Sequence, residues 1–121
     1  MQYLRIYSEK NGDSRFAETE LTISEPDYQP PAPTLFVSHT YDASGLQFVR
    51  LPGGWTGEAL HPPTPQFVIC VDGHLEVTAS DGEKRSIGPG GCLLMEDVHG
   101  KGHRSHVRPG HDCVIGVIAI H

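Results

Sequence analysis

Two histidines and one glutamine are the side chains whose types and spacing point most directly to chemistry. His61 lies five residues before Gln66, which opens a short apolar run, and His103 lies far along the chain. Imidazole nitrogen and amide oxygen suit divalent ions such as Fe, Mn, Ni and Zn. An amide brings no charge, and three donors leave positions for water or substrate, as an open catalytic site requires. The three residues are therefore a candidate metal site, or else the polar residues of a pocket that holds no metal.

Four further residues are candidates to line a substrate pocket beside that site. Side chains on a strand alternate between its faces, so Val68 and Cys70 share the face of Gln66. The other two candidates are Trp55 and Lys101. Such a mixed polar and apolar lining suits a small organic ligand. Three of these residues also have a plainer interpretation. For Trp55 and Cys70 it is packing in the core, although a thiol nucleophile is the other interpretation of Cys70. For Lys101 it is a solvated charge on a loop.

The alternate residues of the same run have the opposite orientation. Phe67, Ile69 and Val71 should face outward if Gln66 faces the interior. Three large apolar side chains on an outer face need cover from another sheet or another subunit.

Other titratable side chains near His103 carry weaker signals. Glu96 and Asp97 form an acidic pair at the end of an expected strand, where one of them could act as a base or a substitute ligand. Solvated loop carboxylates are the default interpretation of such a pair. If His103 faces the interior, His106, which lies three residues beyond it on one expected strand, should face outward.

The elements that must position these residues are short strands joined by tight turns. Asp72-Gly73 is a hairpin signal, with residues 74–79 as the return strand. Glu25 to Pro33 contains four prolines, so it is neither helix nor central strand, and we expect an extended segment along the surface. No segment shows a helical stripe. Further strands are expected at 3–7, 15–23, 35–38, 46–51, 67–71, 84–87, 92–95, 103–107 and 113–120. This pattern predicts an all-β sandwich or barrel.

Composition narrows the class of protein. The 121 residues suit one domain, residues 1–121, and the net charge of -6 argues against nucleic-acid or anionic-membrane partners. No apolar run approaches a membrane span, and the first residues lack the apolar segment of a secretory signal. The three cysteines have no CxxC spacing, which favours free thiols in a reducing compartment. A cytoplasmic location is expected.

From Trp55 onward the chain resembles the cupin superfamily. The first cupin motif reads G-x5-H-x-H-x(3 or 4)-E-x6-G. Counting back from Gly73 places Gln66 at the glutamate position and His61 at the second histidine. The first histidine falls on Ala59, so that ligand is missing.

The second cupin motif, G-x5-P-x-G-x2-H-x3-N, is matched in part. It starts at Gly91, places Asp97 at the proline position, and reaches His103 if the loop carries one extra residue. Val107 stands where the motif has its asparagine. Both motifs lie within residues 52–121, whereas residues 1–51 hold N-terminal strands and the proline-rich arm.

The resemblance implies a fold and a kind of site. It implies a single-domain double-stranded β-helix, an RmlC-like jelly-roll barrel, and a homodimer. Cupin metal sites use three histidines and one glutamate, so the resemblance implies His61, Gln66 and His103 as the remaining ligands of a divalent transition metal.

Three functions follow as hypotheses. The first is a divalent-metal-dependent enzyme that acts on a small molecule, with the metal as Lewis acid or holding an activated water or oxygen, and with the reaction class open. The alternative is a metal-free cupin that binds a small ligand as sensor or carrier. The third is a barrel that has lost its site and serves association only.

Overall fold

The computed structural model describes residues 1–27 and 31–121 of the chain. Every regular element within them is a strand, which confirms the all-β prediction. Of these residues, none belongs to a helix with the length and apolar character needed to cross a membrane. In chain order the strands are β1 (Gln2–Ser8), β2 (Ser14–Glu20), β3 (Glu25–Asp27), β4 (Leu35–Val37), β5 (Ala43–Leu51), β6 (Thr56–Leu60), β7 (Gln66–Asp72), β8 (Leu75–Ala79), β9 (Lys84–Ile87), β10 (Cys92–Glu96), β11 (His103–His106) and β12 (Cys113–Ile120).

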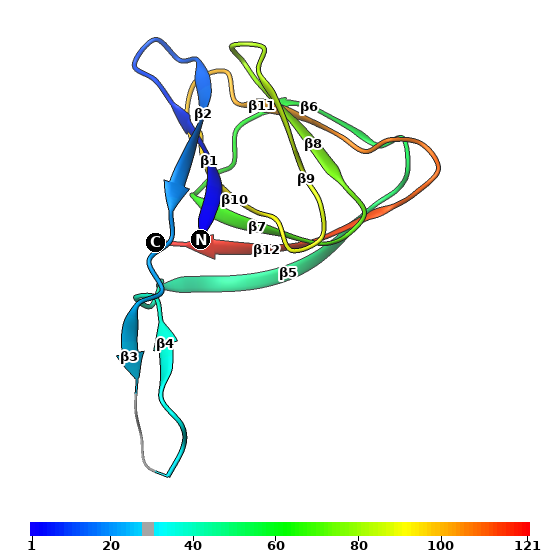
Figure 1. Ribbon diagram of the computed structural model, residues 1–121. Coiled ribbons are helices and arrows are strands. Elements are labelled where there is room, and N and C mark those ends of the chain that lie inside the picture. Colours follow the sequence, from blue (N-terminus) through cyan, green and yellow to red (C-terminus); the bar gives the residue numbers. More distant parts are fainter. Residues whose placement is uncertain (28–30) are drawn as a thin grey trace.

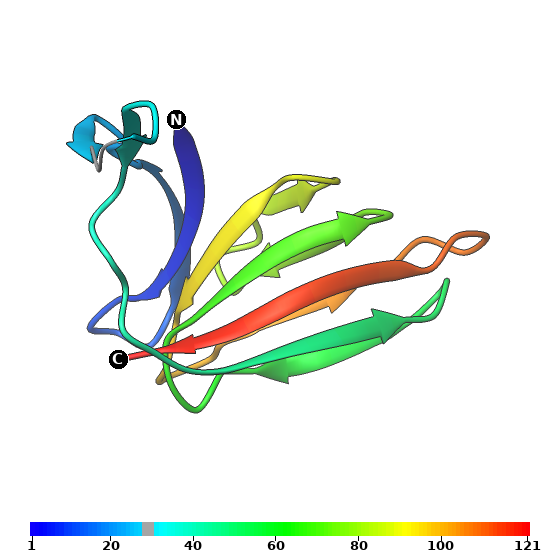
Figure 2. The same cartoon turned by 90° about the horizontal axis from the view of Figure 1, so that it is seen from below.

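Two facing sheets form the body of the molecule. The large sheet has six strands in the order β2-β1-β10-β7-β12-β5, and the small sheet has four in the order β6-β11-β8-β9. Figure 1 shows the small sheet lying across from the large one, and Figure 2 shows the strands of the large sheet side by side. Within both sheets the pairs are antiparallel except β1 with β10. This arrangement is the predicted jelly roll.

The Asp72-Gly73 turn is not the tip of a hairpin, and that prediction was wrong. β7 pairs with β10 and β12, whereas β8 pairs with β9 and β11. The turn therefore carries the chain from the large sheet to the small sheet. Gly73 has a φ of +76°, which suits a turn, but turn chemistry sets only the local reversal and not which strand lies alongside.

The proline-rich segment contributes to an arm that leaves the body. β3 pairs only with β4, and Figure 1 shows this two-stranded arm projecting beyond the end of β5. The segment is neither helix nor central strand, as predicted, but it does not lie along the surface, because pairing with β4 holds it in a separate ribbon. Residues 28–30 of the predicted segment lie outside the described residues.

The core lies between the two sheets and is built mainly from inward residues of β1, β5, β7, β8, β9, β10 and β12. Val68 and Cys70 of β7 are each 1% exposed, as the alternation predicted. Full burial of a side chain such as Val or Leu contributes roughly 1.5–3 kcal/mol, so this layer holds the sheets together. The other buried members are Ile6, Leu51, Leu75, Val77, Ala79, Ile87, Leu93, Met95, Val107, Cys113 and Ile115.

Phe67, Ile69 and Val71 lie on the outer face of the large sheet, which confirms their predicted orientation. Ile69 is 38% exposed and Val71 is 53% exposed. Phe67 is half-buried because its ring packs edge-on against Tyr3 and Tyr41, at centroid distances of 5.7 and 5.1 Å.

We predict that Gly73→Ala destabilises the fold much more than Gly82→Ala. Both glycines have positive φ, so both substitutions cost about 1–2 kcal/mol of backbone strain. A Cβ at Gly73 would also lie 2.3 Å from the carbonyl oxygen of Asp112, whereas nothing lies within 4 Å at Gly82. Urea unfolding should show at least about 2 kcal/mol of extra loss for Gly73→Ala. Equal losses would contradict a close approach of the two chain segments.

Candidate functional site

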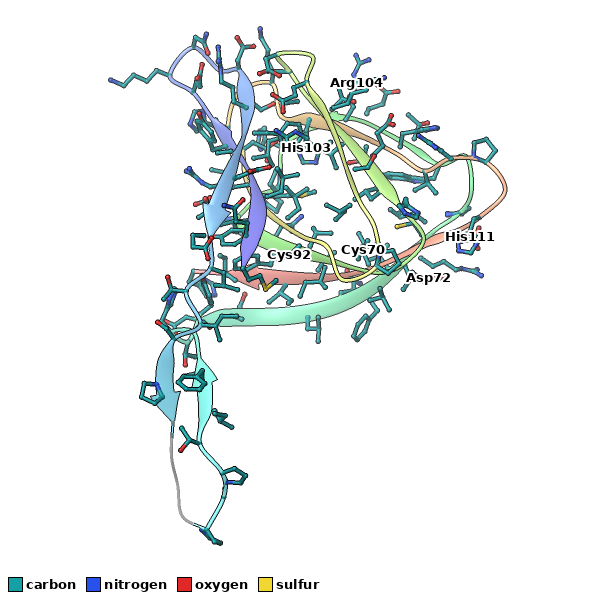
Figure 3. All side chains as sticks on the ribbon, viewed as in Figure 1. Cys70, Asp72, Cys92, His103, Arg104 and His111 are labelled. Carbon is teal, nitrogen blue, oxygen red and sulfur yellow. The ribbon has the colours of Figure 1, made fainter. Side chains whose placement is uncertain are left out.

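His103 lies at the start of β11 and faces the interior of the barrel. It is opposite Ala79 of β8, and Ala79 belongs to the buried inner face of the small sheet. The His103 side chain is 10% exposed. Figure 3 shows His103 between the two sheets and Arg104, its neighbour on β11, directed away from the barrel. His103 therefore has the inward orientation that a ligand or pocket residue of the candidate site requires.

Asp97 is the partner of His103, and its role was missed in the sequence. The carboxylate is fully buried, and its Oδ2 lies 2.5 Å from His103 Nδ1. The expectation of a solvated loop carboxylate was therefore wrong. Its Oδ1 is also buried and has no hydrogen-bond partner within residues 1–27 and 31–121. Leaving a buried acceptor unpaired costs about 1–3 kcal/mol, so this position calls for an explanation.

The loop after β10 turns Asp97 inward because two glycines and the β1–β2 turn hold it there. Gly100 and Gly102 both have positive φ. Lys101 N donates to the Gly12 carbonyl at 2.8 Å, and Ser14 Oγ donates to the Gly102 carbonyl at 2.6 Å. The available signal in the sequence was an aspartate six residues before a histidine with two glycines between them, which permits a loop that doubles back.

The pair gives His103 a defined chemical capacity. Because a carboxylate only accepts hydrogen bonds, this contact favours the tautomer of His103 that carries its hydrogen on Nδ1. The Nε2 atom then keeps its lone pair, and no hydrogen bond engages it among the described residues. An imidazole oriented in this way can accept a proton, accept a hydrogen bond from a ligand, or bind a metal ion.

The other two predicted metal ligands have different surroundings. Gln66 faces inward opposite Met95 of β10, and its Nε2 donates to Met95 Sδ at 3.6 Å. His61 follows β6 immediately after Leu60, the residue opposite His103, and is exposed. Its Nδ1 lies 3.2 Å from the carbonyl oxygen of Pro62. In the described part of the chain, no three His, Cys, Asp or Glu side chains form a group that could hold a metal ion.

The four predicted pocket residues do not gather at one place. Val68 and Cys70 are packed in the core, and Trp55 packs against it with its ring over Gly57. Lys101 is exposed, and its Nζ lies 2.9 Å from Asp13 Oδ1. The assignment of these residues to a substrate pocket stays a prediction.

Lys101 and His103 do border one cleft, beside the β8–β9 turn. Its volume is about 510 Å³, which is within the range of small-molecule sites. The outward side of β11 contributes Arg104, so two cationic side chains border it. The residues that line the cleft are Thr78, Ala79, Ser80, Gly82, Lys101, Gly102, His103 and Arg104.

A second cleft of about 520 Å³ lies by the β7–β8 turn and the β11–β12 loop. His106 lines it from the outer face of β11, opposite Glu76, which confirms its predicted outward orientation. Its Nδ1 lies 3.2 Å from Thr56 Oγ1. His111 Nε2 lies 3.4 Å from Asp72 Oδ2 at the same end, where Figure 3 labels both.

The three cysteine thiols are shielded from solvent in a way that suits packing residues better than nucleophiles. Burial raises the pKa of the Cys70 thiol, and burial together with the adjoining Cys70 thiol raises the pKa of Cys113 to about 12. Burial also raises the pKa of Cys92. Because the thiolate is the nucleophile, raised pKa values favour the packing interpretation of Cys70 over the nucleophile interpretation.

Comparison with solved structures identifies the fold. The chain is similar to the polyketide cyclase RemF from Streptomyces resistomycificus, at 18% identity and a TM-score of 0.56 over 65% of this chain and 55% of that one. It is also similar to a sugar phosphate isomerase of the cupin superfamily from Silicibacter pomeroyi, at 23% identity and a TM-score of 0.53 over 64% of this chain and 50% of that one. The aligned regions thus span about half of each of those proteins.

These similarities confirm the predicted cupin fold, since identities at this level bear on fold alone. No protein-family model matches the sequence, and no curated protein matches it either.

We predict that the Cys113 thiol makes stability fall as pH rises from 9 towards 12. Its folded pKa of about 12 lies above the ordinary value of 9.0, so the unfolded chain releases a proton that the folded chain keeps. The contribution is complete below pH 9 and is lost as pH rises through the folded pKa. Urea unfolding at pH 8, 9, 10 and 11 should show a steeper decline for wild type than for Cys113→Ala, by up to about 1.4 kcal/mol per pH unit. Equal declines in the stability of wild type and Cys113→Ala would contradict a contribution from the Cys113 thiol.

Proposed function

We propose that the protein binds a small organic molecule in the cleft of about 510 Å³ that His103 borders. The observation that supports this proposal is the Asp97–His103 pair, in which a buried carboxylate holds one ring nitrogen and leaves the other available. Burying an ionisable pair that packing does not need is costly. Such pairs are more common at functional sites, where the cost is offset by binding or chemistry.

The charges near this end of the barrel favour an acidic ligand. Arg104 borders the cleft beside His103, whereas the Lys101 ammonium there is already paired with Asp13 Oδ1 at 2.9 Å. A cationic side chain at a cleft raises the local concentration of anions. A ligand that carries a carboxylate or a phosphate therefore suits the site best. Two proteins of this fold are a cyclase and an isomerase by name, but a shared fold does not carry a reaction with it.

The proposed function has a catalytic form and a non-catalytic form. In the catalytic form, His103 Nε2 takes a proton from the bound molecule while Asp97 stabilises the imidazolium that results. In the non-catalytic form, Nε2 only accepts a hydrogen bond from the ligand, and the protein is a sensor or carrier.

A divalent metal at His103 is the second candidate, and the carboxylate-backed imidazole favours it. Metal-binding histidines commonly donate their other ring N–H to a carboxylate, as His103 does to Asp97. The residues present fit a metal at this one position. The exposed His61 ring and the Gln66 amide, whose NH2 is directed at Met95, would have to reorient to complete the set, so we assign no chemical step to a metal.

We predict that small acids bind to the protein through His103. A panel of carboxylates and sugar phosphates, tested by thermal shift, should contain compounds that raise Tm, since a ligand at 100 times its Kd adds about 2.7 kcal/mol. The stabilisation should disappear in His103→Ala. It should persist in His106→Ala, the matched control on the outer face of β11. Elemental analysis after incubation with Fe, Mn, Ni and Zn separates the two candidates.

The thermal-shift and elemental analyses together distinguish a metal-free ligand site from a metal site at His103. Stabilisation by an acid without stoichiometric metal supports the metal-free site, whereas metal that is lost on His103→Ala supports the second candidate. If the protein takes up no metal and no compound stabilises it, both candidate functions are contradicted. A compound that stabilises wild type and His103→Ala equally would place the ligand elsewhere.

We predict that Asp97 holds His103 in the Nδ1–H tautomer. Long-range 1H–15N correlation at neutral pH should show a protonated Nδ1 and an unprotonated Nε2 for His103. In Asp97→Ala the acceptor is lost, so the hydrogen should shift towards Nε2. The exposed His99 is the internal control and should not change. An Nε2–H tautomer of His103 in the wild-type protein would disprove the positioning role.

A further inference from the structure

The second cleft, of about 520 Å³, lies on the outer face of the small sheet, at the end of β11 away from His103. His106, Glu76 and Ser86 stand opposite one another on the neighbouring strands β11, β8 and β9, and they form the floor of the cleft. His106 lies three residues beyond His103, which is roughly 10 Å along a strand and on its opposite face. The cleft is therefore separate from the one that His103 borders.

Two chain reversals wall this cleft and touch each other. The β7–β8 turn contributes Asp72, and the β11–β12 loop contributes Arg108 and His111. Figure 3 shows Asp72 and His111 together at this end of the molecule, where His111 Nε2 lies 3.4 Å from Asp72 Oδ2. A Cβ at Gly73 would lie only 2.3 Å from the carbonyl oxygen of Asp112, so the two reversals are in direct contact. Walls that are held in place in this way lower the ordering cost of binding a ligand.

Hydrogen bonds also fix the remaining borders of the cleft to the body of the molecule. The backbone N–H of Gly54 donates to the carbonyl oxygen of Val107 at 2.9 Å, which anchors the chain just before Arg108. The backbone N–H of Gly90 donates to the carbonyl oxygen of Cys70 at 2.9 Å, which anchors the β9–β10 turn next to the lining residue Pro89. The cleft is therefore formed before any ligand arrives.

Two side chains of opposite charge in this cleft have no charged partner. The Glu76 side chain is half-buried at the centre of the floor, and within residues 1–27 and 31–121 no hydrogen bond or salt bridge engages its carboxylate. Arg108 is exposed on the wall, and its guanidinium forms no salt bridge in the same part of the chain. Partly buried charges are normally paired, so the unpaired Glu76 carboxylate needs an explanation.

Opposite charges that share a cleft without pairing suit a ligand that carries both signs. A guanidinium binds a carboxylate through two parallel hydrogen bonds, and a carboxylate accepts hydrogen bonds from an ammonium group. An anionic ligand would leave Glu76 without a partner, and a cationic ligand would leave Arg108 without one. A metal ion fits less well, because no three His, Cys, Asp or Glu side chains of the described residues form a group that could hold it.

We propose that this cleft is a second binding site, which takes a small zwitterion with its acid group at Arg108 and its ammonium group at Glu76. Because the two side chains do not pair with each other, the ligand must hold its charges several bonds apart, as an ω-amino acid does. The site is independent of the ligand proposed beside His103, since neither Glu76 nor Arg108 borders the first cleft.

Isothermal titration calorimetry with 4-aminobutyrate tests the proposal, and butyrate and butylamine are matched probes with one charge each. Wild type should bind 4-aminobutyrate at least about tenfold more tightly than either probe, because each probe lacks one charge-assisted contact. Glycine, whose charges lie on adjacent carbons, should also bind more weakly. Equal affinity for butyrate or butylamine would overturn a site for zwitterions, and equal affinity for glycine would overturn the separation of its two charges.

Two variants test whether the zwitterion binds in this cleft. Glu76→Gln and Arg108→Gln remove one charge each at nearly constant size, and each should weaken the binding of 4-aminobutyrate at least about tenfold. The matched controls are Glu58→Gln on β6 and Arg50→Gln on β5, which lie outside the lining and should bind as wild type does. Unchanged circular dichroism would show that all four variants fold. No binding by wild type up to about 10 mM, or unchanged binding by Glu76→Gln and Arg108→Gln, would overturn the proposal.

Discussion

The alternation of side chains between two facing sheets is the constraint on which the rest of the structure depends. Because β7 gives every second residue to the interior, Val68 and Cys70 enter the core and Ile69 and Val71 are left outside. The same rule places His103 on the inner face of β11 and Arg104 on the outer face. The core along β7 and the orientation of the candidate site residue on β11 are therefore consequences of one periodicity.

A polar side chain on the inner face must be satisfied there, and Asp97 meets that need for His103. The carboxylate reaches the imidazole because the loop after β10 is held against the β1–β2 turn. The second oxygen of Asp97 is left without a partner among the described residues. Such an imperfectly satisfied pair would be a liability in a purely structural core, which is why it marks the candidate site.

Much of the fold could be predicted from local patterns, and the site could be predicted in part. The strand from Gln66 to Val71, its inward and outward residues, and the turn at Gly73 all follow from period two and turn chemistry. Pairing could not be predicted, because an Asp-Gly turn serves equally well between strands of one sheet or of two. Asp97 was missed because its burial depends on contacts between its loop and a turn more than 80 residues earlier in the chain.

The sequence by itself determined that this is an all-β protein with a partial match to the cupin motifs. It also determined that Phe67, Ile69 and Val71 lie on the strand face opposite Gln66, and it marked His103 as a candidate site residue. Only the tertiary structure decided that Asp97 is the partner of His103, that Gln66 contacts Met95 instead of joining that pair, and that the proline-rich segment leaves the body as an arm. The physical reason is the range of the forces involved. Periodicity and turn preferences act over a few residues, whereas the burial of the hydrogen-bonded Asp97–His103 pair and the pairing of distant strands depend on which segments the folded chain brings together.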